Sequence, residues 1–174
     1  QEFDVLWIGG SDKAATLGRV QDMWLATGSK EAEGFADAVT CNAHAAYSVL
    51  TTKQPPKREG DGSNLVVTFS DCNMSDGVTF DDLYMPIVEW GKYKAEHGSK
   101  AGHWVFFPAF GGGQETFDFK WVTAYENLED LGGDWDQNNE KGWQKVNELF
   151  RGKVSCDSSR AYMATARRQA ENDD

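Results

Sequence analysis

The pattern of apolar and polar positions along the chain predicts an alternation of strands and helices. Short apolar runs bounded by glycine and polar residues predict strands over residues 3–10, 45–52, 65–70, 103–110, 117–125 and 159–166. Residues 14–39 are expected to be helical or irregular, because Gly28 and Gly34 interrupt them. Proline, glycine and charge are concentrated in residues 53–64, KQPPKREGDGSN, which are therefore expected to form a linker.

Two helices are expected in the second half of the chain. Thr79 and Asp82 have the spacing of a capping box, and Gly98 follows as a stop signal. Between them apolar residues recur at helical spacing at Phe80, Leu83, Tyr84, Ile87, Trp90 and Gly91. A turn-rich bend is expected over residues 126–133. A second helix then runs to about Arg151, with its apolar side formed by Trp143, Val146, Leu149 and Phe150.

The chain also repeats itself. A shift of 114 residues aligns residues 3–18 with 117–132, and a shift of 115 aligns residues 35–50 with 150–165. Ten of these 32 positions are identical, against about 2 expected from ordinary residue frequencies. The identical pairs are Phe3/Phe117, Asp4/Asp118, Trp7/Trp121, Leu17/Leu131, Gly18/Gly132, Phe35/Phe150, Val39/Val154, Cys41/Cys156, Ala46/Ala161 and Tyr47/Tyr162.

The repeat and the element order together predict the domain organisation. Residues 65–168 form a complete repeat of order β-α-β-β-α-β, the split β-α-β pattern. Residues 1–52 supply only the last three elements, β-α-β, and so form a partial first repeat. We expect residues 53–64 to link the two and residues 169–174 to form a polar tail. The strands at 3–10 and 45–52 are expected to contribute to a second sheet.

In its element order, and in its aromatic hairpin followed by a bend and a helix, the block 65–166 resembles the dimeric α/β-barrel superfamily. The resemblance implies an α+β fold of tandem ferredoxin-like (β-α-β-β-α-β) units packed sheet to sheet, with the first unit incomplete. No catalytic motif of the superfamily matches, so no catalytic residue is transferred. The superfamily includes monooxygenases, haem-handling enzymes and isomerases, and its fold does not choose among them.

The hairpin over residues 103–125 provides the candidate site residues. If its loop has an even length, even positions of the first strand share a face with odd positions of the second. One face then carries large aromatic residues and packs on the helices. The other face is smaller and mixed, and the resemblance implies that it looks toward the partner unit, where a ligand cavity can form. His103, Asp118 and Lys120 lie on that face and are the predicted ligand-binding residues.

The chain has three cysteines, so at least one cannot form a disulfide within it. Cys41 and Cys156 are equivalent in the repeat, and Cys72 follows the apolar run at 65–70. We therefore expect a Cys72–Cys156 disulfide within the complete repeat, with Cys41 unpaired because its counterpart segment is absent from the sequence. A disulfide favours an extracytoplasmic location, periplasmic or secreted.

Charge and motif spacing argue against several classes of partner. The net charge of −11 disfavours nucleic acid and anionic membrane surfaces. No apolar run approaches the ~20 residues of a membrane span. No metal or cofactor is expected: three scattered histidines make a weak metal site, and the segment beginning at Asp134 has Asn139 and Lys145 where a calcium loop needs Gly and Glu.

Two functions remain open. The favoured one is a non-enzymatic, extracytoplasmic protein that works by binding or assembly. The alternative is a small-molecule enzyme of the dimeric α/β-barrel type, with an apolar pocket between sheets and His103 as acid and base. A three-element half-repeat cannot cover its own sheet, so Trp7, Ile8 and Tyr47 are expected to need covering. An N-terminal half-repeat of about 60 residues, or a second protein chain including an identical one, is the expected partner.

Overall fold

The computed structural model describes residues 5–41, 43–56, 64–113 and 115–167. The chain divides into two compact units, Gln1–His44 and Ala45–Asp174. The polar tail at 169–174 and most of the linker at 53–64 lie outside the described residues. The fold is α+β, and all the described strands belong to the second unit.

The N-terminal unit, residues 1–44, contains two helices. They are α1 (Ala14–Thr27) and α2 (Ser29–Ala36), with Gly28 between them. The strand predicted over residues 3–10 is wrong for the described part, because residues 5–10 form neither helix nor strand. A strand is stable only beside hydrogen-bonding neighbours, and all the described strands pair within the other unit.

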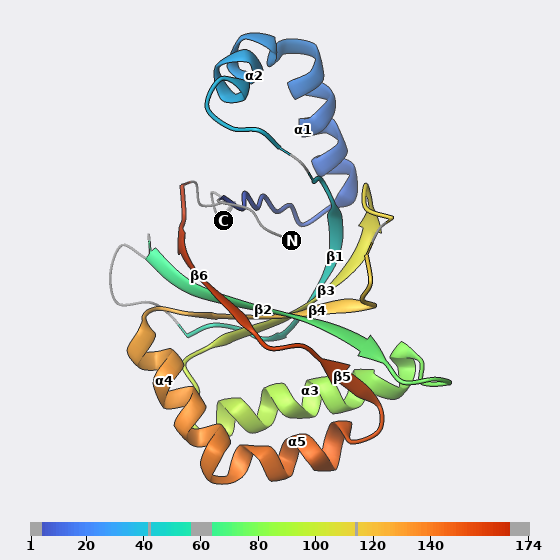
Figure 1. Cartoon of the computed structure of the whole chain (residues 1–174), viewed down its shortest axis with the longest axis vertical. Coiled ribbons are helices and arrows are strands. Elements are labelled where there is room, and N and C mark those ends of the chain that lie inside the picture. The colour runs from blue at the N-terminus through green and yellow to red at the C-terminus, as the bar shows by residue number, and fades with distance from the viewer. Residues whose placement is uncertain (1–4, 42, 57–63, 114, 168–174) are drawn as a thin grey trace. The chain divides into compact units, whose positions relative to one another are not determined.

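The second unit is built on one antiparallel sheet of six strands (Figure 1). The strands are β1 (Ala46–Lys53), β2 (Asn64–Met74), β3 (Gly102–Phe110), β4 (Phe119–Tyr125), β5 (Val154–Cys156) and β6 (Arg160–Thr165). They follow the order β1-β3-β4-β2-β5, and β6 also pairs with β2. The second sheet expected from the repeat is not found among the described residues, since β1 pairs with β3 at the edge of this sheet.

Three α-helices and one π-helical turn cover a single face of this sheet (Figure 1). They are α3 (Phe80–Glu96), α4 (Leu128–Gln137), the π-helix η1 (Asn138–Gly142) and α5 (Trp143–Phe150). The capping box of Thr79 and Asp82 is confirmed at the start of α3. The bend predicted over residues 126–133 is wrong from Leu128 onward: the Asn127 side chain accepts the Asp130 amide hydrogen bond and starts α4 there.

The core lies between this helical layer and the sheet. Leu83 and Ile87 of α3 pack against Val105 of β3 and Phe119 of β4, and all four are fully buried. Full burial of such side chains stabilises the fold by about 1.5–3 kcal/mol each. The helices α3, α4 and α5 therefore stay on this face of the sheet, and the opposite face is free of them. In Figure 1 the sheet curls away from these helices, so that this open face is concave.

Candidate functional site

An aromatic row crosses the open face of the sheet. Tyr47 of β1, Phe106 of β3, Phe69 of β2 and Tyr162 of β6 follow one another with ring centroids 6.0, 6.5 and 5.9 Å apart. Side chains alternate between the two faces of a strand, which explains why four strands each present one ring here. Phe69 in this row is 8% exposed, and Tyr47, Phe106 and Tyr162 are half-buried, so the row lines the open face with partly accessible rings.

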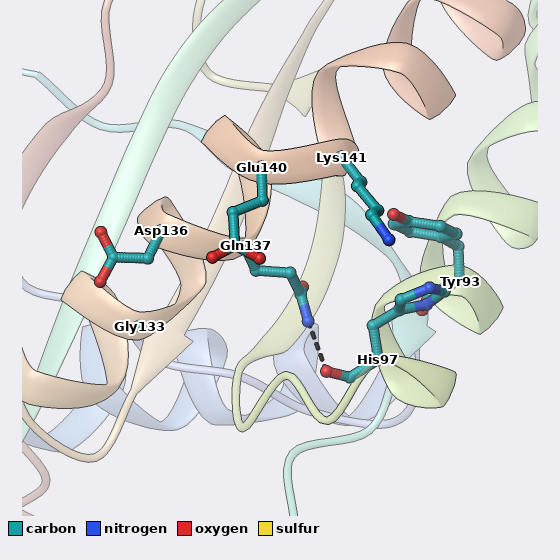
Figure 2. A pocket seen from close by; sticks show the side chains of 7 residues that line it. All are labelled: Tyr93, His97, Gly133, Asp136, Gln137, Glu140 and Lys141. Carbon is teal, nitrogen blue, oxygen red and sulfur yellow. Dashed lines mark hydrogen bonds between the residues drawn. The ribbon is translucent and has the colours of Figure 1, made fainter.

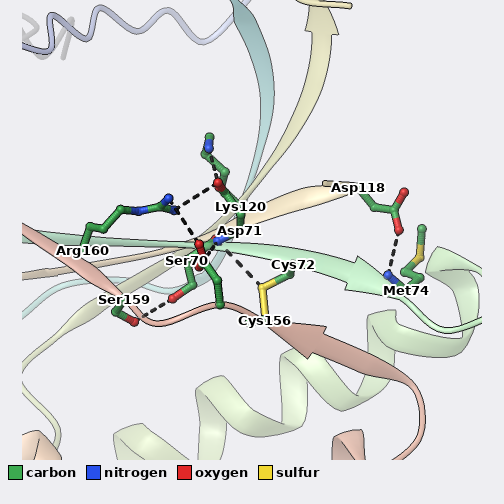
Figure 3. The surroundings of a disulfide bond; sticks show 10 residues. Ser70, Asp71, Cys72, Met74, Asp118, Lys120, Cys156, Ser159 and Arg160 are labelled. Carbon is green, nitrogen blue, oxygen red and sulfur yellow. Dashed lines mark hydrogen bonds and ion pairs between the residues drawn. A yellow bond between two sulfur atoms is a disulfide. The ribbon is translucent and has the colours of Figure 1, made fainter. Parts of the chain in front are cut away.

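Beside this row lies a network of ion pairs centred on Asp71 of β2. Lys120 of β4 pairs with one carboxylate oxygen, and the Arg160 Nη2 atom lies 3.1 Å from the other. Arg160 also reaches Asp157 at 3.2 Å, and the Lys120 amine lies 3.8 Å from the centroid of the Phe117 ring. Figure 3 shows Lys120 and Arg160 converging on Asp71. All these groups are partly solvated, so each pair contributes at most about 1 kcal/mol to stability.

Tyr47 belongs to the aromatic row and also lies close enough to the carboxylates of Asp71 and Glu115 for them to affect its pKa. Burial raises the pKa of its phenol, and the nearby carboxylates of Glu115 and Asp71 raise it further. Tyr47 therefore stays neutral at physiological pH and offers the face one hydroxyl. The open face combines flat apolar rings with a few fixed polar groups, as binding surfaces for partly apolar ligands do.

The predicted assignment of the hairpin faces is wrong. His103 pairs with Thr123, and Val105 with Trp121, so odd positions of β3 share a face with odd positions of β4. The strands join through residues 111–118, where Gly111 and Gly113 have positive φ angles of 81° and 105°. A change of one residue in register exchanges the two faces. The helices therefore cover Phe107, Phe119 and Trp121, whereas Trp104 and Phe106 lie on the open face.

As a result, the three predicted ligand-binding residues are not brought together. Lys120 lies on the open face in the network described above. Asp118 precedes β4, and its carboxylate accepts the backbone N–H of Met74 at 2.7 Å (Figure 3). His103 is 3% exposed and lies on the helix-covered side of the sheet. Of the three, only Lys120 lies beside the aromatic row.

A buried polar cluster lies under the helices, centred on Lys94 of α3. Its amine is 2.9 Å from Asp134 Oδ1, and it donates to Gln137 Oε1 at 2.6 Å and to Asn138 Oδ1 at 3.0 Å. Tyr125 donates its hydroxyl hydrogen to Asp134 Oδ2 at 3.1 Å. The three N–H groups of the ammonium thus have three acceptors, which a buried charge requires.

Burial controls the titration of this cluster. It lowers the pKa of Lys94, and the contacts with Asp134 oppose that shift. Burial raises the pKa of Tyr125, and the neighbouring Asp134 carboxylate raises it further. Burial lowers the pKa of His103 to about 4, with Asp134 acting in the opposite direction. Because its pKa is about 4, the His103 ring is neutral at pH 7. Neither of its ring nitrogens has a hydrogen-bond partner among the described residues.

A shallow surface pocket of about 390 Å³ adjoins this cluster. It is lined by Tyr93, His97, Gly133, Asp136, Gln137, Glu140 and Lys141 (Figure 2). Gln137 donates to the His97 carbonyl while its own oxygen accepts from Lys94. Gln137 thus connects the pocket lining to Lys94 of the buried cluster, and His103 is not among the lining residues.

The predicted disulfide between Cys72 and Cys156 is confirmed, and Cys41 is a free, exposed thiol. Cys72 and Cys156 are directly opposite each other on β2 and β5. Beside them, the Ser70 and Ser159 hydroxyls are 2.6 Å apart (Figure 3). The bridge fixes β5 to β2, an inner strand of the sheet.

Sequence reasoning missed Lys94 and Asp134. A signal for Lys94 existed, since it continues the apolar spacing of Leu83, Ile87 and Trp90 along the buried side of α3. A lysine in such a stripe needs an internal counter-charge. Nothing comparable marks Asp134, which the sequence shows among several other acidic residues.

Within the described residues there is no group of three or more His, Cys, Asp or Glu side chains placed to hold a metal. Nor does that part of the chain include a helix both long and apolar enough to cross a membrane. Comparison with family models, curated proteins and solved structures gave no match.

Proposed function

We propose that this protein is a non-enzymatic, extracytoplasmic binding protein, and that its binding surface is the open face of the sheet. The observation that carries the proposal is the aromatic row of Tyr47, Phe106, Phe69 and Tyr162 on a concave face that α3, α4 and α5 leave free. Aromatic rings provide large contact areas with little loss of conformational entropy, which suits them to recognition.

The ligand is expected to be apolar and ring-bearing, with a negative group within reach of Lys120 and Arg160. Both cations already contact Asp71, so an anionic ligand group would share them with that carboxylate. The Cys72–Cys156 bridge supports the extracytoplasmic location, because disulfides persist in oxidising compartments. The net charge of −11 supports a partner other than nucleic acid.

The tandem layout is part of the same proposal. From β2 onward the elements run β-α-β-β-α-β when α4, η1 and α5 are counted as one helical segment and β5 and β6 as one strand. Their strands are ordered β3-β4-β2, with β5 and β6 beyond β2. This is the order of a split β-α-β unit, and it supports kinship with the dimeric α/β-barrel proteins. In that superfamily two such units pack sheet to sheet.

The enzyme alternative has less support. It places acid and base chemistry on His103, but that ring is 3% exposed and lies on the helix-covered side of the sheet, away from the aromatic row. A general acid or base must come within hydrogen-bond reach of its substrate. We assign no catalytic residue.

The proposal is tested by titrating the protein with 8-anilinonaphthalene-1-sulfonate, an anionic aromatic probe. We expect saturable binding that weakens about fivefold to tenfold in Phe106→Ala, as the loss of one aromatic contact predicts. Lys120→Met should weaken it as well. Trp135→Ser is the matched control, because Trp135 is 57% exposed on α4. Equal affinity in Phe106→Ala and the wild type would contradict the proposal.

A further inference from the structure

The helices of the N-terminal unit reproduce those near the C-terminus. A shift of 114 residues places the first residue of α1 on the first residue of α4, and both ends of α2 on the ends of α5. The same shift places Gly28 on Gly142, and each of them immediately precedes the second helix. A Cβ atom at either glycine would lie 2.6 or 2.8 Å from an atom of the residue four positions earlier. The repeat therefore extends from sequence to helix boundaries and to a shared glycine.

The two copies differ in how much they bury. Leu149 and Phe150 of α5 are 6% and 7% exposed, whereas Phe35 of α2 is 43% exposed. Phe35 corresponds to Leu149 when the two helices are aligned, and to Phe150 in the sequence alignment shifted by 115 residues. No residue of α1 or α2 is buried, and α1 exposes apolar side chains at Val20, Met23, Trp24 and Leu25. In the C-terminal copy, α5, β4 and Cys156 all contact one segment, Asn64–Phe110, which forms β2, α3 and β3.

Three relationships show this dependence. Leu149 and Phe150 of α5 share a core cluster with Leu83 and Ile87 of α3. The strand β4 lies between β3 and β2, whereas its counterpart, residues 5–10, has no regular structure. Cys156 is bridged to Cys72 of β2, whereas its counterpart Cys41 is a free, exposed thiol. A counterpart of Asn64–Phe110 would remedy all three differences at once.

We infer that residues 5–44 dock a β-α-β segment equivalent to Asn64–Phe110, supplied by the same polypeptide immediately N-terminal to Gln1. This inference rests on the tandem layout included in the proposed function. The segment supplies two strands that flank residues 5–10 and a helix that covers α1 and α2. It also carries a cysteine about 45 residues before Phe3, as Cys72 is before Phe117, and this cysteine forms a disulfide with Cys41.

The order of elements identifies the same polypeptide as the source. In the C-terminal copy the β-α-β segment directly precedes Phe117, the counterpart of Phe3. A second copy of this chain cannot supply the segment, because its β2 and β3 are already paired with its own β4, β6 and β1. Its α3 likewise covers its own sheet and α5.

The test compares the 174-residue chain with the polypeptide expressed from its natural start codon. Peptide mapping without reduction is expected to find Cys41 bonded to an upstream cysteine of the same polypeptide. Hydrogen exchange of residues 5–36 should be at least about tenfold slower in the longer polypeptide, as burial and strand pairing predict. Phe35→Ser should lower the urea midpoint of the longer polypeptide and leave that of the 174-residue chain unchanged, whereas Phe150→Ser should lower both.

Two results would overturn the inference. One is a Cys41 that is a free thiol, or is bonded to a different chain, in the longer polypeptide. The other is equal exchange of residues 5–36 in the two proteins, including the case in which the natural start codon adds no β-α-β segment. Both outcomes are independent of probe binding to the open face, so failure of the proposed function and failure of this inference can be told apart.

Discussion

Lys94 and Asp134 form an ion pair that is closed to solvent, with 2.9 Å between Nζ and Oδ1 and side chains that are 0% and 4% exposed. Lys94 lies on α3 and Asp134 on α4, so the pair joins these two helices on the face of the sheet that they cover. Gln137 and Asn138 complete the shell of the ammonium, the latter from the π-helical turn. Removing the charge of either Lys94 or Asp134 would leave the other one buried without its partner.

Removing either partner should therefore destabilise the fold strongly. Lys94→Met and Asp134→Asn are each expected to lower the free energy of unfolding by about 3–5 kcal/mol, because an uncompensated buried charge or donor remains. The double variant should lose less than the sum of the two single losses, by at least about 1 kcal/mol. Urea denaturation measures all three. Lys145→Met removes an exposed pair with Glu89 and Glu148 and should leave the urea midpoint nearly unchanged, because solvent screens such pairs.

His103 should make the fold sensitive to acid. Its pKa is lowered from 6.5 to about 4 by burial, so between these values the unfolded chain binds a proton that the folded protein does not. Stability is then unaffected by this group above pH 6.5 and falls as the pH drops toward 4, by up to about 3 kcal/mol. His103→Leu should flatten this dependence when unfolding is measured from pH 4 to 7. The exposed ring of His97 supplies the control, and a His97→Leu profile as flat as that of His103→Leu would refute the assignment.

Two helical glycines should respond oppositely to alanine. A Cβ at Gly91 in α3 would lie 2.4 Å from the Thr52 carbonyl oxygen of β1, so Gly91→Ala must push helix and strand apart. We expect a loss of about 1–3 kcal/mol despite the better helix propensity of alanine. At Gly132 in α4 no atom lies within 4 Å of the added Cβ. Gly132→Ala should therefore stabilise the protein by about 0.5–1 kcal/mol, and thermal unfolding of both variants would show the contrast.

The disulfide should be a major source of stability. It joins residues 84 positions apart, and closing a loop of that length restricts the unfolded chain, so Cys72→Ala/Cys156→Ala should cost about 2–5 kcal/mol. Cys41→Ala should change little in the 174-residue chain. Thiol titration of the denatured, unreduced wild type should find one free thiol. Three free thiols would show that the bridge does not form in solution.

Much of the second unit was predictable from local pattern. Apolar runs located its long strands, and the Thr79 and Asp82 signal located the start of α3, because these features depend on neighbours in sequence. The Cys72–Cys156 bridge followed from the repeat. The faces of the β3–β4 hairpin did not follow, because one residue in the loop containing Gly111 and Gly113 exchanges inside and outside. Consequently, His103 was predicted on the ligand side and lies under the helices.

The remaining errors concern long-range pairing. A run such as residues 5–10 has strand composition, but whether it forms a strand depends on neighbours that its own residues do not encode. The same holds for β1, whose partner β3 lies far along the chain: Val49 is opposite Phe106, 57 positions later (106 − 49). The aromatic row arises only when four strands take their observed order. The sequence contains all four aromatic residues but does not show that they lie side by side.

The arrangement around β2 has a consequence for biosynthesis. This strand lies inside the sheet, yet β5 and β6, which pair with one of its edges, are synthesised after the other described strands. Phe69 pairs with Arg160, which lies 91 positions later in the chain (160 − 69). At about 5–20 residues per second, translation leaves that edge of β2 unpaired for roughly 5–20 s. During that interval the nascent chain carries an open, apolar strand edge and an unpaired Cys72, so its maturation depends on protection until the C-terminal residues arrive.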